Sequence, residues 1–182
     1  MKGVINKGIQ KLVTAKFGVE AWDAIKERAH CEEPFFSASE DYPDQMTVDL
    51  AIAASEVSGL SLETVLIEFG KYWVPNTGAQ TYPAFFKLAG GSARKFLLNM
   101  DRVHRQVTRS VANARPPGFE YDELPDGRLL VHYRSDRRLC AALHGLILGV
   151  GIHCGEKLDV RETACVKDGA PRCTMEVTFH GS

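Results

Sequence analysis

Hydrophobic residues recur at helical spacing over the first 115 positions and alternate over parts of the remainder. In residues 4–17 the apolar side chains gather on one side of a helix, and Gly18 follows at the usual position for a C-cap. The spacing predicts further helices over residues 19–29, 44–57, 61–74 and 92–115, a loop over 31–43, and a short helix within 75–91.

The second part of the chain predicts strands around one apolar helix. Residues 118–123 and 128–133 form a hairpin around Asp126-Gly127, and residues 157–164 and 172–179 alternate. Residues 139–155 are almost entirely apolar, so their helix should be buried. Helices first, then a helix with strands, is an α+β pattern with an antiparallel sheet.

Three polar side chains follow the second strand of the hairpin at alternate positions. Tyr133, Ser135 and Arg137 would share one face if the strand continued through them. A phenol, a hydroxyl and a guanidinium in a row are suited to binding carboxylates. The alternative is a solvated strand end near a turn.

A histidine lies within the apolar stripe of the long helix. Ser92 is the expected N-cap of this helix, His104 lies on its apolar side, and Pro116-Pro117 end it. Such a histidine is either a core residue or a ligand.

Together these residues resemble a known family. Asp101-Arg102-Val103-His104, then Pro116-Pro117 and Tyr133-x-Ser135-x-Arg137, with Met1-Lys2-Gly3 at the start, are similar to the haem nitric oxide/oxygen binding (H-NOX) domain. The resemblance runs from Met1 to about Val177. It implies one domain over residues 1–182, with a helical distal lobe over about 1–60 and an αβ proximal lobe over about 61–182 that carries a four-stranded antiparallel sheet. Haem b would be buried between the two lobes.

The resemblance also implies roles for single residues. His104 would be the proximal iron ligand, and neutral imidazole suits iron. Tyr133, Ser135 and Arg137 would bind the haem propionates, and Pro117 would press on the ring. Asp44 would pair with Arg137, although it could equally be the N-cap of its own helix. Met100 would pack near the haem or belong to the core.

The expected distal face is apolar. Ala142 stands where dioxygen-binding relatives carry a tyrosine, and Ile5, Ile9, Trp73 and Leu146 complete the pocket. Only Trp73 has a donor, and its indole could face a backbone carbonyl instead. Bound dioxygen needs a hydrogen-bond donor. The expectation is therefore a pocket that binds nitric oxide and CO and excludes dioxygen.

Three of the five cysteines suggest a second site. Cys140, Cys165 and Cys173 match positions that bind structural zinc in some relatives, together with a histidine that is Glu162 in this chain. A carboxylate is a less usual fourth ligand, and His153 or Cys154 could replace it. The alternative is reduced or redox-labile thiols.

Composition limits the class of protein and its partners. The chain has 182 residues, 45% hydrophobic and 25% charged, which is typical of one globular domain. A net charge of −1 gives no reason to expect nucleic acid or an anionic membrane as partner. The polar start and the odd number of cysteines favour a cytoplasmic protein without a signal peptide.

The resemblance implies a sensor rather than an enzyme. Nothing in the sequence suggests a nucleotide loop, a catalytic triad or a cyclase segment, and a haem oxygenase or peroxidase needs polar distal groups. Nitric oxide would release His104, the lobes would rotate, and the signal would pass to a separate effector, a histidine kinase or a cyclic-di-GMP enzyme. The alternatives are a gas carrier or scavenger and a thiol or zinc redox sensor.

Overall fold

The structure is a computed structural model that describes residues 1–108 and 116–180. Its elements follow one another from the N-terminal helices to the C-terminal sheet. They are α1 (Gly3–Phe17), α2 (Val19–Arg28), α3 (Asp44–Ser58), α4 (Leu62–Trp73), a π-helical turn (Val74–Gly78), α5 (Ala79–Thr81), α6 (Pro83–Ala89), α7 (Ala93–Thr108), β1 (Gly118–Glu123), β2 (Leu129–Arg134), α8 (Cys140–Cys154), β3 (Lys157–Ala164), a 3-10 turn (Val166–Asp168) and β4 (Cys173–His180).

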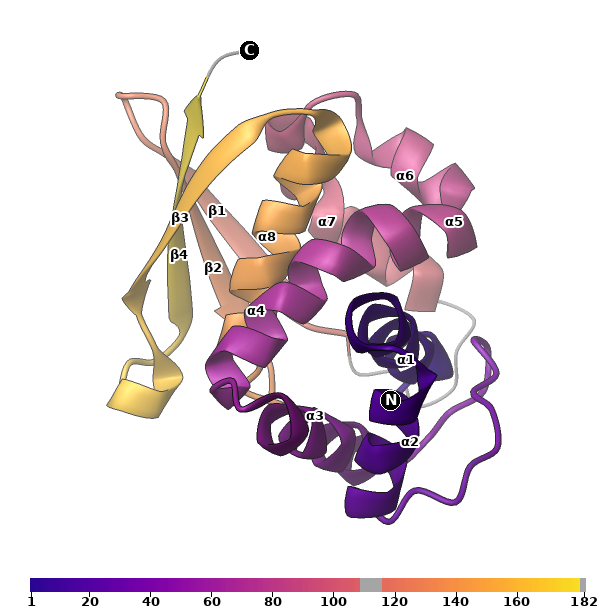
Figure 1. The fold of residues 1–182 in the computed structure, drawn as a ribbon. Coiled ribbons are helices and arrows are strands. Elements are labelled where there is room, and N and C mark those ends of the chain that lie inside the picture. The colour runs from indigo at the N-terminus through magenta and orange to yellow at the C-terminus, as the bar shows by residue number, and fades with distance from the viewer. Residues whose placement is uncertain (109–115, 181–182) are drawn as a thin grey trace.

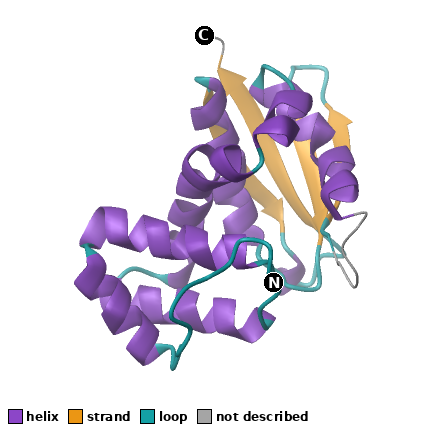
Figure 2. Ribbon diagram, turned by 90° about the vertical axis from the view of Figure 1, so that its right-hand side faces the viewer, coloured by secondary structure: helices purple, strands orange, loops and turns teal. Residues whose placement is uncertain are grey.

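The elements form a helical part and a part built on a sheet. Helices α1, α2 and α3 lie together at one end of the molecule, and the strands lie at the other (Figures 1 and 2). Each part has a hydrophobic core of its own. Helix α4 serves both, because Phe69 belongs to the helical core while Trp73, the last residue of α4, packs against both cores. The α+β class expected from the sequence is confirmed.

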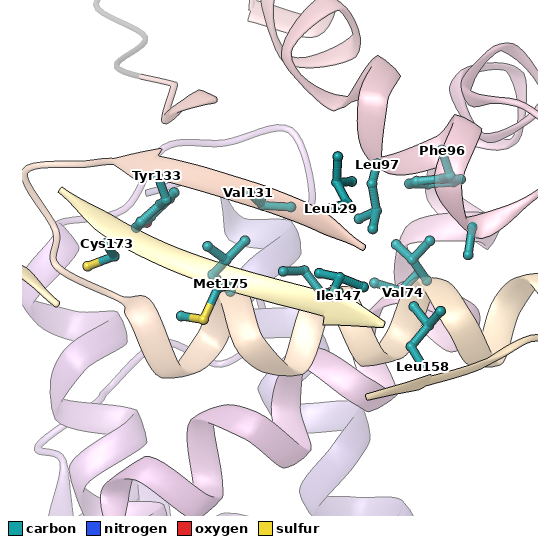
Figure 3. Close-up of a cluster of buried hydrophobic side chains, with 14 of the residues drawn as sticks. Val74, Phe96, Leu97, Leu129, Val131, Tyr133, Ile147, Leu158, Cys173 and Met175 are labelled. Carbon is teal, nitrogen blue, oxygen red and sulfur yellow. The ribbon is translucent and has the colours of Figure 1, made fainter. Parts of the chain in front are cut away.

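The sheet has four antiparallel strands in the order β1-β2-β4-β3. The hairpin of β1 and β2 turns through Gly127, whose φ of 85° explains the glycine. One face of the sheet covers α8, and side chains such as Val131, Met175 and Ile147 fill the space between them (Figure 3). The register between β3 and β4 shifts between Glu162 and Ala164, as at a β-bulge.

Helices α4 and α8 touch backbone to backbone. Glycines make the approach possible: a Cβ on Gly145 would overlap the Ile67 carbonyl oxygen, and one on Gly149 would lie 2.7 Å from the Gly70 oxygen. Helix α8 is largely buried, as its apolar sequence predicted. This contact fixes the position of α8 between the sheet and the helical part.

The structure corrects two boundaries drawn from the sequence. The helical path does not end at Val74 but continues from α4 through the π-helical turn into α5. This turn contains Pro75, which has no amide hydrogen to donate within a regular α-helix. Strand β2 ends at Arg134, so the shared strand face expected for Tyr133, Ser135 and Arg137 is wrong. The last part of the helix expected over 92–115 lies outside the described residues.

The N-cap predicted at Ser92 is present, since Ser92 Oγ accepts a hydrogen bond from the amide of Lys95 at 3.3 Å. Ser61 caps α4 in the same way, with its Oγ accepting from the amide of Thr64 at 3.1 Å. In the described ranges no single helix is long and apolar enough to cross a membrane. The helices of residues 44–58 and 62–81 are together long and apolar enough to cross one, but the chain bends by 109° between them.

Replacing Gly145 by alanine should destabilise the protein by about 1–3 kcal/mol, because the added methyl group forces α4 and α8 apart. The midpoint of urea unfolding measures this. Gly91→Ala is the matched control, since a Cβ there would meet no atom within 4 Å. Equal midpoints for the two variants would contradict the close packing of α4 on α8.

Candidate functional site

The Tyr-x-Ser-x-Arg motif runs from the end of β2 into a turn. Tyr133 is buried at 7% exposure, and Ser135 and Arg137 follow in the turn, where the Arg137 amide donates to Ser135 Oγ at 3.3 Å. Burial raises the pKa of Tyr133, and its hydrogen bond with Ser135 opposes that. Tyr133 therefore keeps its proton and is a donor, as are Ser135 and Arg137. The turn, not strand alternation, gathers these donors.

Asp44 lies where the helical part meets this turn. Its carboxylate accepts from Arg137 Nε at 2.7 Å and lies 2.8 Å from the Met1 amino group. The expected pair with Arg137 is thus present. Pro43 occupies the N-cap position of α3, and Asp44 is the first helical residue. The two positive groups outweigh partial burial, which acts in the opposite direction, and hold the pKa of Asp44 below its usual value.

His104 lies on α7 with its imidazole facing β1. Burial, only partly opposed by the Met100 carbonyl, lowers its pKa, so the ring is neutral at physiological pH. Its Nδ1 is buried without a hydrogen-bond partner of acceptable geometry among the described residues. The ring lies against Phe119 of β1, with ring centroids 5.4 Å apart and 16° between the planes. A buried neutral imidazole is the form that binds iron.

A cavity of about 90 Å³ lies between α1, α3, α4 and the first turn of α8. This volume exceeds what one water-sized molecule needs. Ile5, Ile9 and Ala142, expected on the distal face, all line it. The other lining residues are Met1, Leu12, Val13, Thr47, Val48, Ala51, Ala54, Leu62, Val65, Leu66, Phe69 and Leu139.

The donors on the cavity lining are engaged, whereas Nδ2 of Asn6, beside Thr47, is buried without a hydrogen-bond partner among the described residues. Thr47, which the sequence did not single out, is the one polar side chain among the described lining residues, and its hydroxyl donates to Asn6 Oδ1 at 2.6 Å. The indole of Trp73 donates to the Val4 carbonyl at 3.4 Å, which is the alternative left open by the sequence. No hydrogen-bonding pattern in the sequence marks Thr47, because its partner Asn6 is distant along the chain.

The remaining expected residues lie around the core of the sheet. Met100 and Leu146 pack against this core, as Trp73 also does, and none of the three lines the cavity as described. Pro117 is half-buried just before β1. The structure thus places Ile5, Ile9 and Ala142 on one cavity, whereas Trp73 and Leu146 pack against the core of the sheet and are not among its described lining residues.

Three thiols and one carboxylate form a compact cluster. The ligand atoms of Cys140, Glu162, Cys165 and Cys173 all lie within 4.8 Å of one another. Sγ of Cys165 lies 3.7 Å from Cys140 and 3.9 Å from Cys173, near the edge of about 3.8 Å that a tetrahedral zinc–thiolate site requires. The Cys140–Cys173 separation is shorter, at 2.6 Å. Glu162 lies at the register shift between β3 and β4, and the three thiols come from α8, β4 and the segment after β3.

The alternative fourth ligands are placed elsewhere. The ring of His153 packs edge-on against Phe86 at 5.0 Å and Phe96 at 6.1 Å, at the opposite end of α8 from Cys140. Cys154 is the last residue of α8 and about 21 Å along the helix from its first. The suggestion that His153 or Cys154 could replace Glu162 is therefore wrong.

The residues present fit a haem group. A neutral buried imidazole could hold the iron, donors on the turn after β2 could bind carboxylates, and apolar side chains line the adjoining cavity. Among the described residues, His104 Nδ1 makes no hydrogen bond of acceptable geometry, which indicates that this ring is not placed to complete a hydrogen-bond network.

A model of the family described as HNOB, haem-NO-binding, matches residues 2–162. The chain therefore belongs to the H-NOX family, the gas-sensing haem domain of the type found in soluble guanylate cyclase, and such domains bind haem. This domain is a sensor domain and is not itself catalytic.

Curated relatives are guanylate cyclases. Soluble guanylate cyclase 89Db of Drosophila melanogaster is 24% identical over 137 residues, 75% of this chain and 20% of the relative. Soluble guanylate cyclase gcy-32 of Caenorhabditis elegans is 28% identical over 157 residues, 82% of this chain and 22% of the relative. The chain thus spans about a fifth of these relatives' length, and the match is to the haem domain alone.

Solved H-NOX structures share the fold. An H-NOX protein from S. oneidensis in the Fe(II)NO ligation state has a TM-score of 0.90 at 20% identity, covering 100% of both chains. An oxygen-binding H-NOX domain related to soluble guanylate cyclases, solved as the oxygen complex, has a TM-score of 0.83 at 26% identity, covering 100% of this chain and 96% of that one. Family membership alone therefore leaves the choice of gas open.

Replacing Asp44 by asparagine should lower the stability at pH 7 by about 0.5–1 kcal/mol, because this carboxylate is 46% exposed and its pairs are partly screened. A carboxyl whose folded-state pKa is depressed contributes its stability above the usual aspartate pKa of about 3.9, and the contribution is lost as the pH falls further. Urea unfolding at pH 7 and pH 3 measures both effects.

The matched control is Asp49→Asn, on the same helix, whose carboxylate accepts a bond from Gln45. A stability difference between wild type and Asp44→Asn that grew on acidification would contradict the ion pairs of Asp44.

Proposed function

We propose that the protein senses nitric oxide at haem b, also binds CO, and excludes dioxygen. One observation supports this selectivity most. Among the described residues that line the cavity, the single side-chain donor, the Thr47 hydroxyl, already donates a hydrogen bond to Asn6. Bound dioxygen carries partial negative charge and needs such a donor, whereas nitric oxide and CO do not.

The haem contacts would come from both parts of the fold. His104 would hold the iron, Tyr133, Ser135 and Arg137 would hold the propionates, and Pro117 and Met100 would lie against the proximal side. Ile5, Ile9, Trp73, Ala142 and Leu146 would form the distal side. When bound, the haem would supply an iron that binds nitric oxide, and His104 is the residue that would hold this iron and be released from it.

The chain's own contacts provide the switch. Release of His104 would free α7, which packs against both α8 and β1. The ion pair of Asp44 with Arg137 joins the first turn of α3 to the turn after β2, which carries Ser135 and Arg137. A change at either tie shifts the helical part, about residues 1–60, against the rest of the chain, and this gives the two arrangements that a sensor requires.

The signal would pass to a separate protein. A sensor domain that is not catalytic needs an effector, and a histidine kinase or a cyclic-di-GMP enzyme in the cytoplasm would serve. A gas carrier or scavenger would share the pocket but would not change the activity of any partner on binding nitric oxide.

Ala142→Tyr should create dioxygen binding, because a phenol at this position enters the cavity and supplies the missing donor. The absorption spectrum of the reduced protein in air shows it directly. Ala141→Tyr, one residue earlier on α8 and absent from the cavity lining, should leave the spectrum in air unchanged. Failure of Ala142→Tyr to respond would mean that the pocket lies elsewhere.

We also propose that Cys140, Cys165 and Cys173, with Glu162, bind a structural zinc ion. The support is their compactness and two of the three sulfur–sulfur distances. Reduced thiols that act as a redox sensor are the competing function of the same cluster.

Metal analysis should find about one zinc ion per chain, and Cys173→Ser should remove most of it, because a four-ligand site loses one thiolate. Cys31→Ser is the control, since Cys31 lies outside the cluster. Well under one zinc ion per chain in the unmodified protein would exclude zinc and favour the thiols.

A further inference from the structure

The imidazole of His104 stacks on another ring and has no hydrogen bond of acceptable geometry at Nδ1 among the described residues. It stacks on Phe119 with 5.4 Å between centroids and 16° between planes. Histidines that bind metals usually donate their second ring N–H to a carboxylate or a carbonyl, which fixes the plane of the ring. Here the nearby backbone carbonyl is that of Met100, and Nδ1 forms no hydrogen bond of acceptable geometry within residues 1–108 and 116–180. Stacking on Phe119 is therefore the best-formed contact that orients the ring.

Phe119 is itself held firmly. Its ring lies parallel to that of Tyr121, at 6.4 Å and 8°, and is tilted by 44° against Tyr133 at 5.7 Å. Phe119 and Tyr121 alternate inward on β1, and Tyr133 lies directly opposite Phe119 on β2. The aromatic rings that support the His104 imidazole, those of Phe119, Tyr121 and Tyr133, thus belong to the sheet, whereas His104 belongs to α7.

We propose that Phe119 is a positioning residue for His104: it sets the plane in which the imidazole meets the iron and keeps the ring close when the iron bond breaks. The proposal rests on the assignment of His104 as the iron ligand. It adds that release and recapture of His104 depend on β1. Tyr133, which is expected to bind a propionate, packs against Phe119 and so contacts the residue that supports His104.

The test measures the contact between the imidazole and Phe119 with an imidazole that is not attached to α7. In haem-loaded His104→Gly protein, free imidazole is titrated and its binding to the iron is followed by absorption. The titration is repeated with Phe119→Leu and with Phe119→Tyr in the same background. Phe86→Leu, which removes a ring that touches Phe96 and His153 in the same core but not His104, is the matched control.

Phe119→Leu should weaken imidazole binding by roughly threefold to tenfold, the size of one aromatic stacking contact. Phe119→Tyr keeps the ring and should retain the affinity, and Phe86→Leu should not change it. Equal affinities with phenylalanine and leucine at position 119 would overturn the proposal. An equal loss with Phe86→Leu would also overturn it, since that would reflect general loosening of the core.

A measurement on the unmodified sequence covers the case in which Phe119→Leu fails to hold haem. Through-space NMR contacts between the ring protons of His104 and Phe119 are expected in the reduced, CO-saturated protein, and their absence would overturn the proposal. Neither experiment uses nitric oxide. A protein that passed both but kept its His104–iron bond in nitric oxide would lose the proposed switch and retain this inference.

Discussion

The backbone contact between α4 and α8 is the constraint on which the site depends. Glycines on both helices let the two backbones touch, and side chains at these positions would push α8 away from α4. The first turn of α8 then carries Cys140 toward the thiol cluster and Ala142 toward the apolar cavity. The placement of α8 therefore determines the geometry of both the candidate metal site and the candidate gas site.

Two further contacts hold helices to the hairpin of β1 and β2 and to the turn that follows it. On one side, Asp44 of α3 pairs with Arg137 of the turn after β2. On the other, His104 of α7 lies on Phe119 of β1. Both join a helix to the sheet's hairpin or to the turn that follows it, so binding at the iron and at the propionates would act on the same hairpin. Under the proposed assignments, this arrangement would give a physical route from a bound gas to a shift between the two parts of the chain.

The sequence predicted the fold class and most elements, because hydrophobic periodicity records which face of each segment is buried. It also predicted the pair of Asp44 with Arg137 and the grouping of Cys140 with Cys165 and Cys173. It failed where tertiary contacts decide: Ser135 and Arg137 lie on a turn, and the helix continues past Pro75. Phe119 and Thr47 could not be singled out, since an inward phenylalanine or a threonine on a helix has no signature of its own in a single sequence.

The central claim is that His104 binds the haem iron and is released when nitric oxide binds. The most direct test is the absorption spectrum of the reduced protein, recorded without oxygen, then in air, then with nitric oxide. The account predicts a five-coordinate spectrum that air does not change and that nitric oxide converts to that of a five-coordinate haem without its histidine ligand. A stable oxygen complex in air would contradict the selectivity, and a six-coordinate spectrum in nitric oxide would contradict the release of His104.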